Sequence, residues 1–125
     1  MLANAELQTL ALTADIPTAI TFYEEVLGLS LKANSDGAAV FDVGGRDLRV
    51  SPVAETSPTE HTVFGFAVAD VQGVAEELSS KGVPLVEFQG FPHDQNGLVA
   101  TPDGSRVCWF RDPDGNLISV VQYPT

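Results

Sequence analysis

The chain has 125 residues, 44% of them hydrophobic, and its 17 acidic and 6 basic residues give a net charge of −11. This length predicts one domain with a real core, and the hydrophobic share excludes a disordered chain. The negative charge disfavours nucleic acid and anionic membranes as partners and favours cationic ligands, unless the acidic residues simply keep two helix faces soluble. No apolar run approaches the roughly 20 residues of a membrane span, and the N-terminus lacks a signal-peptide pattern, so we expect a cytoplasmic protein.

The first predicted elements are a short apolar strand over 7–15 and an amphipathic helix over 16–27. Asp15 can cap the free amides of the first helical turn, and Gly28 can adopt the left-handed conformation that ends a helix. Shorter strands should follow, divided by glycine turns. We place these strands at 29–33, 38–43 and 48–53, with turns at Asp36-Gly37 and Gly44-Gly45.

The same order of elements is then written a second time. An apolar strand over 62–70 ends in Asp70, and a helical stripe over 71–81 stops at Gly82. Three further strands are predicted at 85–91, 106–110 and 117–123, the last two joined by a tight Asp-Pro-Asp-Gly turn over 112–115. A duplicated strand-helix-strands unit usually sets its two sheets side by side around a pocket. The sequence therefore predicts one α+β domain over 1–125, made of modules 1–54 and 62–125.

Two segments remain outside this pattern, and the one cysteine lies inside it. Residues 54–60 are polar and contain Pro58, which suits a linker between the modules. The stretch 92–104 has no clear periodicity, so a flap over the pocket and an irregular surface loop are equally open interpretations. Cys108 lies in a strand-like run, where a buried, reduced thiol is the plain interpretation. A catalytic cysteine would need a nearby histidine and an electropositive setting.

Two motifs then point to a family. Phe22 to Leu29 (FYEEVLGL) resembles the signature after the first strand of the vicinal oxygen chelate superfamily, and Trp109 to Ile118 (WFRDPDGNLI) resembles its counterpart near the C-terminus. That superfamily includes glyoxalase I, extradiol dioxygenases and bleomycin-resistance proteins. The resemblance implies two βαβββ modules whose curled mixed sheets surround a shared cavity, commonly in a homodimer. Both motifs describe packing and a turn, so they indicate a fold more than a chemistry.

Catalytic members of the family hold a divalent metal with inward-facing His and Glu side chains. The resemblance carries those positions onto Gln8, Val63, Ser119 and about Ser51, and these side chains do not suit a catalytic metal. We therefore expect no metal cofactor. His61 and His93 each lack two further ligands. His61 is predicted to be an exposed residue at a strand entry, and His93 an ordinary polar residue of the 92–104 loop.

Strand alternation predicts which side chains line the pocket. If Gln8 and Val63 face inward, their neighbours two and four residues along each strand do so too, and Leu117, Val121 and Tyr123 share the face of Ser119. Several aromatic residues, such as Trp109, could stack on a planar ligand. The predicted ligand-binding set is Gln8, Leu10, Leu12, Val63, Gly65, Ala67, Trp109, Ser119 and Val121.

Two functions follow from this pocket. The first is a metal-free protein that sequesters or carries a small hydrophobic or cationic aromatic molecule, and the missing metal ligands and apolar face favour it. The second is a divergent lyase, isomerase or dioxygenase with relocated ligands, or a metal-free catalyst that uses a carboxylate of Asp42, Asp47 or Glu87 as base. We expect the binding function, in a homodimer.

Overall fold

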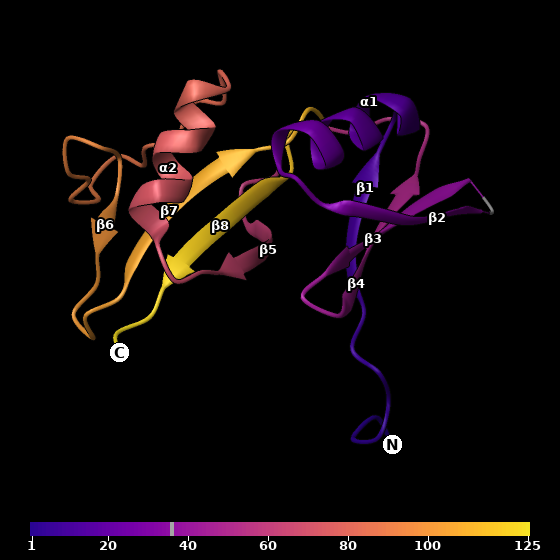
Figure 1. Ribbon diagram of the computed structural model, residues 1–125, viewed down its shortest axis with the longest axis horizontal. Coiled ribbons are helices and arrows are strands. Elements are labelled where there is room, and N and C mark those ends of the chain that lie inside the picture. The colour runs from indigo at the N-terminus through magenta and orange to yellow at the C-terminus, as the bar shows by residue number, and fades with distance from the viewer. Residues whose placement is uncertain (36) are drawn as a thin grey trace. The chain divides into compact units, whose positions relative to one another are not determined.

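The computed structural model describes residues 1–35 and 37–125, so Asp36 of the predicted Asp36-Gly37 turn lies outside the described residues. The chain divides into two compact units, Met1–Thr56 and Ser57–Thr125, and their boundary falls inside the predicted linker 54–60. Each unit contains one helical segment and one four-stranded sheet (Figure 1). No helix in the described part of the chain is long and apolar enough to cross a membrane.

Unit 1 has the order strand, helix, three strands, as the repeat predicted. The sheet order is β1-β4-β3-β2, with β1 parallel to β4 and the other pairs antiparallel. A parallel pair needs a crossover connection, and the helix between β1 and β2 lies on that path. The elements are β1 (Thr9–Thr13), α1 (Ile16–Thr21), the π-helical turn η1 (Phe22–Val26), β2 (Ser30–Ser35), β3 (Ala38–Val43) and β4 (Arg46–Pro52).

The helix of unit 1 starts and stops where predicted, but it changes form midway. The Asp15 carboxylate accepts from the Thr18 amide at 3.2 Å, which confirms the N-cap, and Gly28 follows with a φ of 74°. The last turn is π-helical, with the Leu27 amide bonding the Phe22 carbonyl at 3.1 Å. One widened turn leaves the apolar side chains near the same face, so a 3.6-residue periodicity does not reveal it.

One face of the unit 1 sheet carries its core. Alternate strand residues are buried against the helix, where the Tyr23 and Phe41 rings lie 5.4 Å apart and both are fully buried. Val50 and Ala11 are paired across β4 and β1 on the same face, and both are at most 2% exposed. The opposite face, which we call the open face of unit 1, is therefore left for other contacts.

Unit 2 repeats the topology, with the order β5-β8-β7-β6 and β5 parallel to β8. The Asp70 carboxylate caps the helix by accepting from the Gly73 amide at 3.0 Å, as predicted. The chain is thus an α+β protein of two βαβββ-like modules, each with a mixed four-stranded sheet, which confirms the predicted fold class. The elements are β5 (Thr62–Ala67), α2 (Val71–Ser80), β6 (Val99–Ala100), β7 (Arg106–Arg111) and β8 (Leu117–Gln122).

The predicted strand 85–91 is wrong, and its place in the sheet is taken by β6. Leu85 forms one isolated bridge with Phe110, and the Val86 amide bonds the Trp109 carbonyl at 2.8 Å. The pairing then ends because the Phe88 amide bonds the His93 side chain instead of a strand. The edge strand β6 comes from the 92–104 stretch, which alternation alone could not assign because the strand has only two residues.

Candidate functional site

The open face of unit 1 contains a hollow of about 550 Å³. Leu10 and Leu12 lie on this face and are 45% and 47% exposed, as alternation along β1 predicted. Gln8, just before β1, lines the hollow itself. The predicted residues of unit 1 therefore share one side of the sheet, and an apolar strip runs beside a more polar hollow. The other lining side chains relevant below are Lys32, Val40, Arg46, Asp47 and Arg49.

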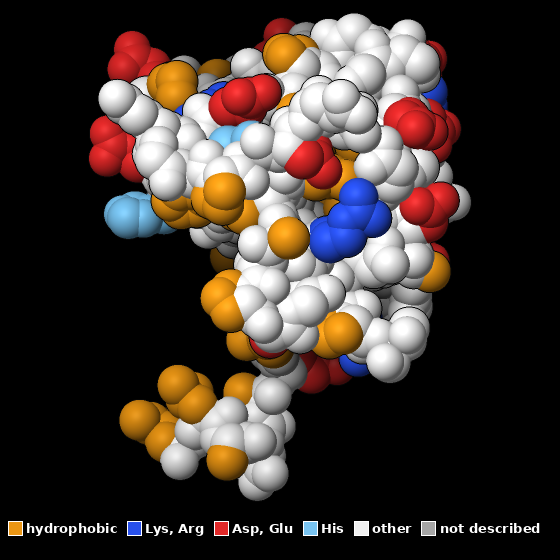
Figure 2. Space-filling model, turned by 90° about the vertical axis from the view of Figure 1, so that its left-hand side faces the viewer, with side chains coloured by type: hydrophobic (Ala, Val, Ile, Leu, Met, Phe, Trp, Pro, Cys, Tyr) orange, Lys and Arg blue, Asp and Glu red, His pale blue; other side chains and the backbone are white. Residues whose placement is uncertain are grey.

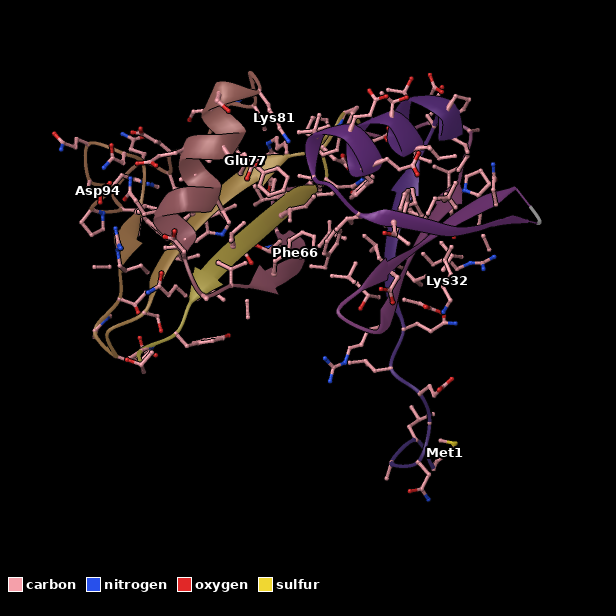
Figure 3. All side chains as sticks on the ribbon, viewed as in Figure 1. Met1, Lys32, Phe66, Glu77, Lys81 and Asp94 are labelled. Carbon is pink, nitrogen blue, oxygen red and sulfur yellow. The ribbon has the colours of Figure 1, made fainter. Side chains whose placement is uncertain are left out.

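Positive charge gathers around this hollow, which the net charge of the chain does not suggest. Lys32, Arg46 and Arg49 line it, and they are three of the six basic residues. Lys32 extends from β2 on the side away from α1 and pairs with Asp47 at 2.7 Å (Figure 3). The hydrogen bond from Lys32 to Asp47 raises the pKa of the lysine. The charges of a strongly acidic protein are thus locally mixed on this face.

The acidic residues elsewhere are dispersed. Figure 2 shows acidic side chains spread over the viewed face, between polar and hydrophobic ones. On α2, Glu77 pairs with Lys81 at 3.4 Å along the exposed side of the helix (Figure 3). An exposed pair at this spacing contributes only a few tenths of a kcal/mol. These features support the interpretation that many carboxylates serve solubility.

In unit 2, three predicted site residues lie side by side on the face away from α2. Gly65 of β5 pairs with Ser119 of β8, and Ser119 pairs with Trp109 of β7. The Ser119 hydroxyl occupies the space where a side chain on Gly65 would lie. The absence of a side chain on Gly65 therefore leaves no free space, because the Ser119 hydroxyl of the neighbouring strand fills it.

Ala67 and Val121 form the next row of this face and border open space. They pair across β5 and β8, and Ala67 is exposed. Val121 lines an apolar hollow of about 460 Å³ together with Val107 and Tyr123, whose ring is 61% exposed. We call Val107, Val121 and Tyr123 the apolar hollow of unit 2; Ala67 lies beside it, next to Val121 in the sheet. Small residues thus lie on β5, and larger apolar ones lie on the neighbouring strands.

Val63 departs from simple alternation. The register between β5 and β8 shifts between Thr62 and Phe64, so Val63 is the extra residue of a bulge. A bulge changes the direction in which side chains point. The alternation of faces along β5 from Phe64 onward therefore does not predict which face Val63 occupies. Val63 is 37% exposed, at the outer end of the strand.

His93 has a structural role that sequence reasoning missed. Its Nε2 accepts from the Phe88 amide at 2.9 Å, and its Nδ1 lies 3.0 Å from the Gly97 carbonyl, so Nδ1 carries the proton. The ring also belongs to a cluster with Phe88, Phe91 and Trp109, whose centroids lie 5.0 to 6.3 Å apart. His93 therefore links the two ends of its loop by hydrogen bonds to Phe88 and Gly97 and is not an ordinary polar residue.

The positions implied for a metal do not fit one. Gln8 offers an amide, Val63 offers no donor atom, and Ser119 offers a hydroxyl that packs against Gly65. Divalent catalytic metals in proteins favour imidazole and carboxylate ligands. Among the described residues no group of three or more His, Cys, Asp or Glu side chains is placed to hold an ion. His61 is exposed at the entry to β5, as predicted.

The three carboxylates considered as a catalytic base lie in open surroundings. Asp42, Asp47 and Glu87 are all exposed, and Asp47 already pairs with Lys32. A base tuned by burial would need a desolvated setting, which these positions lack.

The single thiol lies under α2. Cys108 is fully buried, and burial raises its pKa to about 11. Because the thiolate is the reactive form, we expect a disulfide reagent at pH 8 to modify the native protein roughly a hundredfold more slowly than the unfolded chain. Timed labelling with and without denaturant measures this ratio. Equal rates would contradict the buried position.

The thiol also makes stability depend on pH at the alkaline end. The folded pKa is higher than the unfolded value, so folding favours the protonated form. Its contribution is complete below the unfolded pKa near 9 and is lost as the pH rises towards 11.

The sequence model of the Glyoxalase/Bleomycin resistance protein/Dioxygenase superfamily matches residues 7–120. The chain belongs to this superfamily. The chain is 33% identical over 118 residues to virulence protein STM3117 of Salmonella typhimurium, covering 88% of this chain and 78% of that protein. It is 30% identical over 129 residues to the uncharacterized protein YraH of Bacillus subtilis, with coverages of 91% and 94%.

Solved structures of the superfamily show the same architecture. The crystal structure of lactoylglutathione lyase from Agrobacterium tumefaciens matches with a TM-score of 0.74 at 21% identity, covering 95% of this chain and 93% of that one. At this identity the likeness shows the fold alone, because one fold hosts many chemistries. Membership in the superfamily therefore confirms the recognised motifs and leaves the function to the residues of the site.

Proposed function

We propose that this chain is a superfamily member that binds a small, partly hydrophobic molecule without a metal, and that it sequesters or carries this molecule. The residues that the resemblance places at the family's metal positions support this best, because Gln8, Val63 and Ser119 are not imidazole or carboxylate ligands. Such a substitution removes the Lewis acid on which metal catalysis depends.

The open sheet faces supply the surface for binding. In unit 2 the apolar hollow is lined by Val107, Val121 and the exposed Tyr123. The small Ala67 lies beside Val121 in the sheet. A concave apolar surface with few polar groups is the usual form of a small-molecule site. A homodimer is part of the proposal, because Val63 and Phe91 are apolar side chains with 37% and 52% of their surface exposed.

Replacing Ala67 with phenylalanine tests the hollow. Ala67 is exposed, so the ring should enter open space and change the free energy of unfolding by no more than about 0.5 kcal/mol. It should also lower the affinity for the neutral dye N-phenyl-1-naphthylamine about tenfold, since it occupies the space that the ligand would use. Fluorescence titration and thermal unfolding measure the two effects.

Ala11 provides the matched control for this substitution. It lies in β1, the first strand of the other unit, but it faces the helix and is 2% exposed. Ala11→Phe should cost about 1–3 kcal/mol of stability because it overpacks a core. Unchanged dye affinity in Ala67→Phe, or a loss of stability as large as in the control, would contradict the proposed hollow.

A further inference from the structure

The open face of unit 1 has a chemistry that a purely hydrophobic ligand would not use. Arg49 lies at the centre of β4, paired in register with Leu10 of β1 and Val40 of β3. Its side chain is half-buried and lines the 550 Å³ hollow. No ion pair to Arg49 or Arg46 is formed among the described residues.

The acidic groups nearby do not neutralise Arg49. Asp47 is engaged by Lys32 at 2.7 Å, and Asp42 adds to the charge that raises the lysine pKa. Glu6, also on the lining, is exposed. A half-buried guanidinium without a carboxylate partner has lost part of its hydration, and a hydrogen-bonding anion would restore those contacts.

The neighbours of Arg49 suggest what else the anion should carry. Leu10 is beside it in the sheet, Leu12 follows on the same face, and Val40 lies on the other side. Gln8 lines the hollow at the near end of β1 and can donate an additional hydrogen bond. An acidic group on Arg49 would thus place the rest of the molecule against apolar side chains.

We propose that Arg49, with Arg46 at the rim, forms an anion subsite, and that the ligand is a small amphiphilic oxyanion whose apolar body lies on Leu10 and Leu12. The planar guanidinium suits two parallel hydrogen bonds to a carboxylate, sulfonate or phosphate group. This inference rests on the proposed function, because it names the ligand class of a binding protein. It also differs from the cationic ligand that the net charge predicted, since the local charges oppose that choice.

Two dyes that share one ring system test the subsite. 8-Anilinonaphthalene-1-sulfonate carries a sulfonate that N-phenyl-1-naphthylamine lacks, so a contact with Arg49 should contribute to the binding of the first dye and not of the second. We expect the native protein to bind the sulfonated dye more tightly. Arg49→Gln should lower that affinity about tenfold or more while leaving the neutral dye unchanged, as the loss of a charge-assisted contact implies.

Control variants separate the contact from charge and folding. Arg106→Gln removes the same charge from unit 2, where Arg106 bonds Gln72 at 3.1 Å, and it should leave both dyes unaffected. Arg49→Lys keeps the charge but loses the fork, so its affinity for the sulfonated dye should fall between those of the native protein and Arg49→Gln. Circular dichroism confirms that each variant is folded.

The outcomes show separately whether the anion subsite is wrong and whether the proposed binding function is wrong. If both dyes bind equally and Arg49→Gln changes neither, the anion subsite is wrong and the binding function stands. If Arg106→Gln weakens the sulfonated dye as much as Arg49→Gln, the effect is one of overall charge and the subsite is also wrong. If neither dye binds, the proposed function fails together with the subsite.

Discussion

Replacing Asp112 with alanine should lower the free energy of unfolding by about 3 kcal/mol. The carboxylate is 6% exposed and organises the turn between β7 and β8. It accepts from the Asp114 amide at 2.9 Å, from the Asn116 amide at 3.0 Å and from the Asn116 side chain at 2.8 Å. Alanine would remove all three of these hydrogen bonds, two of which are buried. Denaturant unfolding at neutral pH measures the loss.

Asp94 provides the control because it forms the same kind of loop on the surface. Its carboxylate accepts from the Asn96 and Leu98 amides at 2.8 and 3.0 Å, but the side chain is exposed. Water can replace the carboxylate there, so Asp94→Ala should cost about 1 kcal/mol or less. Similar losses in the two variants would show that burial of the Asp112 network contributes little.

Gly115→Ala should destabilise the protein by roughly 2–4 kcal/mol, for two reasons. Gly115 has a φ of 83°, the positive angle predicted for this turn, which is unfavourable for any residue with a side chain. An added Cβ would also lie 2.7 Å from the Pro58 Cα, and backbone cannot move aside as a side chain can. The Gly115 carbonyl accepts from the Thr59 amide and from Arg111, so the strain would reach the segment before β5.

Gly90→Ala separates the two causes. Gly90 has a similar φ of 89°, but nothing lies within 4 Å of an added Cβ. Its substitution should show the conformational cost alone, about 1–2 kcal/mol. Thermal unfolding of both variants gives the difference, and an equal loss would mean that the Pro58 contact relaxes freely.

The elements that local chemistry determines could be predicted from sequence. Asp15 and Asp70 cap their helices because a carboxylate satisfies amides in the first turn, wherever the helix later packs. Gly115 and Gly28 adopt positive φ values because the chain must reverse there. In unit 1 the strand that follows the capped helix also forms where it was predicted and pairs within the sheet.

The features that depend on neighbours in space could not be predicted from the sequence. Ser119 fills the space beside Gly65 from another strand, which no pattern within 62–70 reveals. The two-residue strand β6 exists because β7 offers it a pairing edge, while the more hydrophobic 85–91 turns away through His93. The gathering of basic residues around Arg49 arises from the folding of β2 and β4 onto one sheet. Net charge sums over such placements and hides them.

The most direct test of the central claim is a titration of the native protein with N-phenyl-1-naphthylamine after exhaustive chelation, repeated with added nickel, manganese or zinc. We expect saturable binding to the chelated protein, with an affinity that none of the metals changes, because Gln8, Val63 and Ser119 do not supply the ligands that such an ion needs. Dye binding that appears only when a metal is added would contradict this expectation. So would a tightly held stoichiometric ion whose removal by the chelator abolishes dye binding.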